Sequence, residues 1–186
     1  MGWLNPWTFI AGQKLTAAQM NAYLRDNTNF LHKNVRFFIN TAASNSGTGE
    51  TDLTGYTYPI SANELASVGD GYDIDGQGSC ASNAATKTIR LDVAGQKYVL
   101  LQTTANGGYW TFKLRLSYYS NTQLRYSGYS TYGAAGGGVP TLVHHFGAMS
   151  SLNFTTAQTL KLTAQGSIGS ADITAQEFMS RWIFAT

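Results

Sequence analysis

Large apolar and polar residues alternate strictly over residues 109–119, and this pattern predicts a half-buried β-strand. The apolar members share one face of the strand: Trp110, Phe112, Leu114, Leu116 and Tyr118. The polar members share the other: Thr111, Lys113, Arg115 and Ser117. Because successive side chains of a strand point to opposite faces, we expect the first set in a core and the second in solvent.

Further strand-length runs follow from about residue 52 onward, separated by glycine-rich turns and without a second helical period. They cover residues 88–93, 97–104, 122–127, 141–147, 158–165 and 177–184. The turns at Ala94-Gly95 and at residues 106–108 are short enough to join neighbouring strands as hairpins. Seven or eight such strands predict a mainly β fold, a β-sandwich or jelly roll.

A short helix is expected before this β region. Thr16 and Gln19 have the spacing of a capping box, which marks a helix start. The residues that follow at alternating spacings of four and three form a short heptad seam: Met20, Leu24, Asn27, Leu31 and Asn34. The seam predicts self-association through Met20, Leu24, Asn27 and Leu31, while a single amphipathic helix packed on the domain is the alternative. Residues 35–41 indicate a strand or an extended exit from the helix.

The expected organisation is therefore an N-terminal attachment segment with a helix, residues 1–45, and a β-sandwich domain, residues 46–186. Residues 1–12 hold the aromatic side chains of Trp3, Trp7 and Phe9, which would form an exposed apolar patch if nothing covered them. They either fold back on the β domain of the same chain or insert into a neighbouring protein.

Composition excludes several partner classes. Charged residues make up 12% of the chain and the net charge is +2, so no concentrated positive field is available for nucleic acid. No run approaches the ~18 apolar residues of a membrane span, and we expect neither a secretory signal nor a membrane anchor. Cys80 is the single cysteine, so no disulfide within the chain is possible.

No residue constellation predicts catalysis, a cofactor or a metal site. His144 and His145 are adjacent on an expected strand and so point to opposite faces. Asp70, Asp73 and Asp75 resemble a calcium loop, but the glutamate that an EF-hand requires is missing, and a solvated acidic turn is favoured. Residues 133–138 lack the Gly-Lys-Ser/Thr signature of a phosphate-binding loop, and a mobile surface loop is expected instead. We expect no enzyme activity.

Five tyrosines within fifteen residues are the strongest candidates for contact with a ligand: Tyr118, Tyr119, Tyr126, Tyr129 and Tyr132. Aromatic side chains mixed with Ser, Gly and Asn give adaptable contact surfaces for sugars or proteins. We assign the binding role to Tyr126, Tyr129 and Tyr132, which flank the glycine-rich loop. Packing of alternate tyrosines in the core or in a subunit interface is the other interpretation.

The N-terminal sequence resembles a segment of many tailed-phage minor structural proteins, where it precedes a β-rich domain. Residues 7–21 read WTFIAGQKLTAAQMN, and residues 24–27 read LRDN. Residues 160–166, LKLTAQG, are similar to the closing strands of such domains. The resemblance implies a virion protein, often trimeric, that attaches through its N-terminal part and presents a β domain outward. This chain lacks an extended shaft, which favours a short fibre, knob or surface-decoration role.

The leading hypothesis is thus a homotrimeric structural protein of a tailed-phage virion, assembled in the host cytoplasm. Its partners would be two further copies of itself, other virion proteins through the N-terminal segment and, as a candidate, a host surface glycan. The alternative hypothesis, motivated by the same tyrosines, is a monomeric carbohydrate-binding module.

Overall fold

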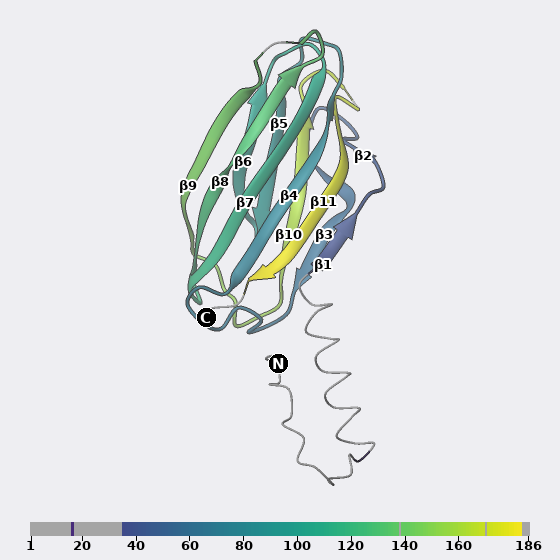
Figure 1. Cartoon of the computed structure of the whole chain (residues 1–186). Coiled ribbons are helices and arrows are strands. Elements are labelled where there is room, and N and C mark those ends of the chain that lie inside the picture. The colour runs from purple at the N-terminus through teal and green to yellow at the C-terminus, as the bar shows by residue number, and fades with distance from the viewer. Residues whose placement is uncertain (1–15, 17–34, 138, 170, 184–186) are drawn as a thin grey trace.

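The computed structural model describes residue 16 and residues 35–137, 139–169 and 171–183 (Figure 1). The expected helix, with the association residues Met20, Leu24, Asn27 and Leu31, lies outside the described residues. Its existence and its role in self-association stay predictions. Within the described ranges, no helix is long and apolar enough to cross a membrane.

The described residues form eleven β-strands. They are β1 (Val35–Ile39), β2 (Ala43–Ser44), β3 (Thr51–Ile60), β4 (Gly71–Cys80), β5 (Lys87–Val93), β6 (Gln96–Thr103), β7 (Gly108–Ser120), β8 (Gln123–Ala134), β9 (Thr141–Ser150), β10 (Gln158–Gly166) and β11 (Ile173–Ile183). All strand pairs are antiparallel. The prediction of a mainly β domain is confirmed.

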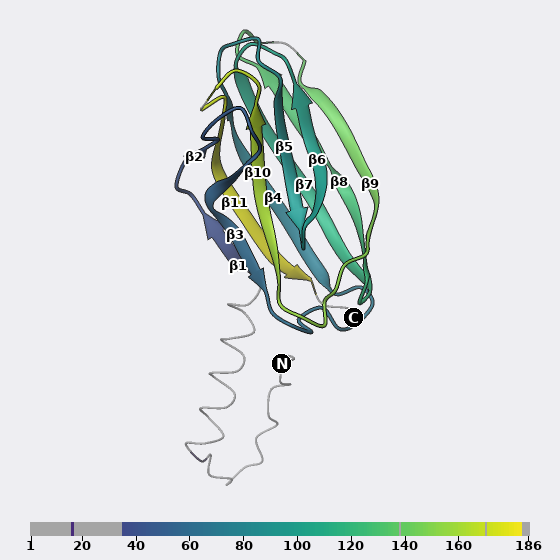
Figure 2. The same ribbon diagram turned by 180° about the vertical axis from the view of Figure 1, so that it is seen from behind.

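The strands form two sheets that pack face to face, as the two opposite views in Figures 1 and 2 show. The large sheet has the order β1-β11-β4-β7-β8-β9, with β2 also paired to β11. The small sheet has the order β3-β10-β5-β6. Strands β1 and β2, which precede the expected domain boundary at residue 45, are thus part of the large sheet.

The connections between the strands are those of a jelly roll. The strand pairs β3/β4, β4/β5, β6/β7 and β10/β11 are each consecutive in sequence but lie in different sheets. Four strands of each sheet, β1-β11-β4-β7 and β3-β10-β5-β6, therefore wind together as two interleaved antiparallel layers. The paired strands β8 and β9 widen the large sheet beyond β7. The expected β-sandwich of jelly-roll type is confirmed.

The core lies between the sheets and follows the alternation seen in the sequence. On β7 the side chains of Trp110, Phe112, Leu114 and Leu116 are buried, while the intervening residues face outward. Tyr72 of β4 makes edge-to-face contacts with Tyr58 and Trp182 from β3 and β11. Each large apolar side chain buried in this way contributes about 1.5–3 kcal/mol.

Strand β4 is the main correction to the secondary-structure prediction, because Asp73 and Asp75 lie in a strand and not in an acidic turn. Gly76 and Gly78 occupy inward positions of β4. A Cβ atom at Gly76 would lie 2.7 Å from the Phe112 ring, and one at Gly78 would lie 2.4 Å from the Trp110 ring. These glycines make room for the aromatic side chains of β7.

Two turn predictions have different outcomes. Ala94 and Gly95 both have positive φ angles, 53° and 84°, and they join the paired strands β5 and β6, so this hairpin is confirmed. The hairpin expected at residues 106–108 is wrong, because this turn leads from β6 in the small sheet to β7 in the large sheet. A short glycine-containing turn permits a change of direction but does not determine which sheet the next strand joins.

Candidate functional site

The outer face of the large sheet brings polar side chains from four strands into adjacent rows. In one row Arg181 of β11, Asp73 of β4, Arg115 of β7 and Ser127 of β8 are successive cross-strand partners. In the next row Asp75, Lys113 and Tyr129 are partners.

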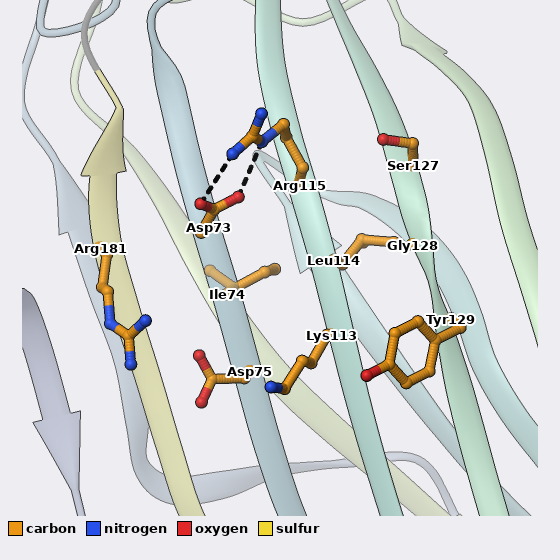
Figure 3. A pocket seen from close by; sticks show the side chains of 10 residues that line it. All are labelled: Asp73, Ile74, Asp75, Lys113, Leu114, Arg115, Ser127, Gly128, Tyr129 and Arg181. Atoms are coloured by element: carbon orange, nitrogen blue, oxygen red, sulfur yellow. Dashed lines mark hydrogen bonds and ion pairs between the residues drawn. The ribbon is translucent and has the colours of Figure 1, made fainter.

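Cross-strand neighbours lie within about 5 Å at their Cβ atoms, so these groups act as one surface. A hollow of about 290 Å³ opens on this surface. Figure 3 shows the side chains around it, with Arg181 and Lys113 on either side of Asp75 and Tyr129 beyond Lys113. A second hollow of about 150 Å³ adjoins it and shares Asp75 and Lys113. Together they form a groove, called the outer groove below, that contains hydrogen-bond donors, acceptors and an aromatic ring.

Only part of the charge in the outer groove is paired. Arg115 donates two hydrogen bonds to Asp73, from Nε to Oδ1 at 2.9 Å and from Nη2 to Oδ2 at 3.0 Å. This bidentate pair raises the pKa of Arg115 and fixes both side chains.

Lys113 and Arg181 differ from Arg115, because among the described residues neither makes a hydrogen bond or an ion pair with a carboxylate within 4.0 Å. Both act on Asp75 over a longer distance. Partial burial raises the pKa of Asp75 in spite of these two cations. The outer groove therefore has three carboxylates, Asp73, Asp75 and Glu177, and three cations. Two of these cations, Lys113 and Arg181, form no ion pair among the described residues.

The three predicted binding tyrosines do not lie on one surface. Tyr129 points outward into the groove and is 37% exposed. Tyr126 is half-buried on the inner face, with its ring centroid 4.3 Å from that of Tyr98. Tyr132 is buried, and its hydroxyl donates to the carbonyl oxygen of Gly107. Positions 126 and 132 differ by an even number and share a face of β8, whereas position 129 falls on the other face.

The other two tyrosines of the sequence cluster differ in the same way. Tyr118 packs against the core, with an edge-on contact to Phe154. Tyr119 is 45% exposed, and the Arg125 guanidinium lies 4.0 Å from its ring centroid. Core packing therefore accounts for Tyr118, Tyr126 and Tyr132, whereas Tyr119 and Tyr129 face solvent.

His144 and His145 point to opposite faces of β9, as predicted. His144 is exposed, whereas His145 is 5% exposed and lies in a buried polar network. Ser130 Oγ donates to the carbonyl oxygen of Leu100 at 2.6 Å. It therefore accepts from His145 Nε2 at 2.9 Å, which leaves Nδ1 to accept from the Tyr98 hydroxyl at 2.8 Å. Burial lowers the pKa of His145, which favours this neutral form.

The Ser130–His145 pair has the separation of a nucleophile and its base but not their accessibility. Ser130 is 1% exposed, and its hydroxyl proton is directed at a backbone carbonyl and not at the histidine. A substrate carbonyl carbon could not reach Oγ without displacing the strands around it. The pair therefore closes the corner where β6 contacts β8 and β9 and does not present a nucleophile.

The three aspartates of the expected acidic turn do not converge on a common point. Asp70 Oδ2 accepts from the backbone N–H groups of Ala66 and Ser67 at 3.2 and 2.8 Å, and Asp73 binds Arg115. Within the part of the chain that the structure describes, no group of three or more His, Cys, Asp or Glu side chains could hold a metal ion.

The outer groove contains two residues for which the sequence predicted no binding role, Lys113 and Arg181, and it contains Asp75, which was considered only as part of a calcium loop. The sequence does indicate that Lys113 is exposed, because the alternation in residues 109–119 places it on the solvent face of the strand. No comparable signal connects it to Arg181, since the register that brings β11 and β7 to either side of β4 is a property of the folded sheet.

Comparisons with known proteins leave the family of the chain open. No protein-family model matches it, and no curated protein matches it. One similar solved structure is described as that of infectious bursal disease virus, Gx strain, with a TM-score of 0.34 and 8% sequence identity. The match covers 80% of this chain and 32% of that chain, so this protein spans about a third of the other's length. A TM-score of this size carries no functional argument.

Proposed function

We propose that the protein is a structural component of a tailed-phage virion, a homotrimeric short fibre, knob or surface-decoration protein that acts by contact and not by catalysis. The observation that carries the proposal is a jelly roll with an open polar groove on its outer face, combined with a Ser–His pair that is closed to substrate. Jelly rolls serve as capsid and lectin domains, in which binding surfaces matter more than reactive groups. This last step is an analogy at the level of the fold.

The resemblance of residues 7–27 to a segment of tailed-phage minor structural proteins supports the place in the virion. In this proposal the N-terminal segment binds other virion proteins, and Met20, Leu24, Asn27 and Leu31 associate in the trimer.

An apolar edge strand supports self-association. β9 ends the large sheet, and its exposed side chains include Leu142, Val143 and Phe146, the last 82% exposed. Exposed apolar edge strands promote unwanted pairing in free monomers, so proteins usually cover or interrupt them. A neighbouring subunit would cover this edge in an oligomer.

Light scattering on the purified full chain tests the oligomer. We expect three times the mass of one chain, and we expect the double variant Leu24→Asp, Leu31→Asp to reduce it to one. A matched double variant with aspartates outside the seam, Asn29→Asp, His32→Asp, should keep the trimer. A monomeric unmodified chain would contradict the proposal. Mass spectrometry of purified phage particles tests the location, and absence of the chain from the particles contradicts it.

A monomeric carbohydrate-binding module is the second candidate function, favoured by the outer groove with Tyr129 at its wall. The two functions differ in oligomeric state and in location. A chain that is monomeric, absent from virions and able to bind a glycan would support the module. Release of sugar fragments from a bacterial surface polysaccharide by the purified chain would contradict both, because each assigns the chain no catalytic activity.

A further inference from the structure

We propose that the outer groove binds a carboxylated saccharide, with Lys113 and Arg181 holding the carboxylate and Tyr129 contacting the sugar ring. This inference rests on the proposed contact function and adds the ligand class and the residues. It places the glycan site on the outer face of β4, β7, β8 and β11.

Two cations without an ion pair are the first reason to expect a ligand with a carboxylate. Lys113 and Arg181 come from β7 and β11, on the two sides of β4, and Figure 3 shows them flanking Asp75 without an ion pair to it. On the small sheet, by comparison, Lys161 pairs with Asp52 at 2.8 Å and Lys97 with Glu50 at 3.1 Å. Two unpaired cations around a hollow offer charge-assisted hydrogen bonds to a carboxylate.

The remaining groups of the outer groove suit a sugar better than a bare anion. The Tyr129 ring presents an apolar surface for the C–H groups of a pyranose ring. Asp75 and Ser127 offer hydrogen-bond acceptors for ring hydroxyls. An inorganic anion would use the cations but would leave the ring and these acceptors without a role.

The second reason to expect a ligand in the outer groove is that its side chains are already held in place. The bidentate Arg115–Asp73 pair fixes one wall of the hollow, and every lining side chain stands on a strand of the sheet and not on a loop. Binding therefore requires little ordering of the protein, which reduces its entropic cost. The hollow of about 290 Å³ is at the small end of the ~300–1,000 Å³ range of small-molecule sites, as expected for a few sugar units.

The adjoining hollow gives the groove a direction along the strands. It is lined by Gln77, Thr111 and Glu177, with a hydrogen bond of 3.0 Å from Gln77 Nε2 to Glu177 Oε2. Lys113 is the one cation that lines this hollow among the described residues. The amide, hydroxyl and carboxylate groups of this hollow suit the neutral hydroxyls of a sugar. A saccharide chain would place its acidic unit between Lys113 and Arg181 and a further unit toward Thr111.

Calorimetric titration of the full chain at low salt with oligogalacturonate tests the proposal. The methyl ester of the same oligosaccharide keeps the ring hydroxyls and removes the charge, and inorganic phosphate keeps a charge without the ring. We expect binding of oligogalacturonate, at least about tenfold weaker binding of the ester, and no measurable binding of phosphate at the same concentration. Equal binding of acid and ester, or binding of phosphate as tight as that of the acid, would overturn the proposal.

Variants locate the binding on the sheet. Arg181→Gln and Lys113→Gln should each weaken binding of the acid about tenfold and leave binding of the ester unchanged, whereas Tyr129→Ala should weaken both. Tyr109→Ala is the matched control, because Tyr109 is 67% exposed on the same face of β7 but does not line the groove. An unchanged thermal midpoint in each variant shows that the fold is intact.

The outcome separates this inference from the proposed function. A trimeric chain found in virions that ignores oligogalacturonate overturns the saccharide site and leaves the virion role standing. A monomeric chain that binds the acid through Lys113 and Arg181 overturns the virion role and leaves the saccharide site standing.

Discussion

The inner and outer faces of the large sheet are built from alternate residues of the same strands, yet they have different roles. On the inner face of β7 and β8, Trp110 and Tyr132 are buried, and their polar atoms donate to backbone carbonyls. On the outer face Tyr109 and Tyr129 are exposed. The same residue type thus supports the fold at one position and faces solvent at a position three residues away.

The orientation of a side chain on its strand, and not its residue type, therefore decides whether it is available for contact with a ligand. At the inner face Ser130 and His145 are buried and hydrogen-bond within the fold, with Tyr98 of the facing sheet as a partner. On the outer face Lys113 and Arg181 line an open hollow and form no ion pair among the described residues. Substitutions at neighbouring positions should therefore have separable effects, on stability from the inner face and on binding from the outer face.

The largest difference in stability between the two faces is expected for Trp110→Ala and Tyr109→Ala. Trp110 is 1% exposed and stacks with Phe112, so its removal should lower the free energy of unfolding by about 3–5 kcal/mol. Removal of the exposed neighbour Tyr109 should change it by no more than about 0.5 kcal/mol. Urea denaturation of both variants measures the difference. Similar losses would show that the two faces are not distinct.

A smaller difference in stability is expected between His145→Gln and His144→Gln. The first disturbs the buried network and should cost about 1–3 kcal/mol at neutral pH, because it leaves hydrogen-bonding groups of Tyr98 or Ser130 without a partner. The exposed His144 should be replaceable at little cost. Denaturation curves at about pH 7.5 provide the comparison, and an equal cost at both positions would contradict the assignment.

The same two variants should also differ in how their stability depends on pH. Burial lowers the pKa of His145 below the ordinary 6.5, so below that pH the unfolded chain binds a proton that the native chain does not. The stability contributed by neutral His145 is complete above about pH 6.5 and is lost as the pH falls toward the lowered value. His145→Gln should reduce the loss of stability between about pH 7.5 and pH 5.5, while His144→Gln should keep it.

The smallest effect is expected from the Arg115–Asp73 pair on the outer face. The two side chains are 55% and 43% exposed, so solvent screens the pair and their coupling should contribute only about 0.2–1 kcal/mol to stability. A double-mutant cycle with Arg115→Gln and Asp73→Asn measures it. A coupling well above this range would show that the outer face, too, holds the fold together.

Strand β7 could be predicted within a residue or two because its alternation is strict and its apolar side chains are large. Strand β4 could not, since its closely spaced aspartates favoured an acidic turn. The space that Gly76 and Gly78 leave for the rings of Phe112 and Trp110 exists only in the folded sheet. The jelly-roll class followed from the number of strands and their length. The arrangement of β6 and β7 in different sheets did not, because it depends on contacts between distant segments.

The candidate site could be predicted only in part, for a related reason. Strand period alone separates Tyr129 from Tyr126 and Tyr132, because odd-numbered and even-numbered positions of β8 face opposite ways. It therefore predicts that these three tyrosines do not share one surface. Arg181 and Arg115, in contrast, come to lie on the two sides of Asp73 only after three strands have paired in a particular register. Binding sites on the face of a sheet are properties of that register.

The most direct test of the account is an NMR titration of the labelled full chain with oligogalacturonate that follows side-chain N–H signals from each face. The Nε–H signal of Arg181 reports on the outer groove, the indole Nε1–H of Trp110 on the core, and the Nε–H of Arg90 on the small sheet. We predict saturable shifts for Arg181 with Trp110 and Arg90 unchanged. Shifts at Arg90 without shifts at Arg181, or no saturable shift at any of the three, would contradict the claim that the outer face of the large sheet is the contact surface.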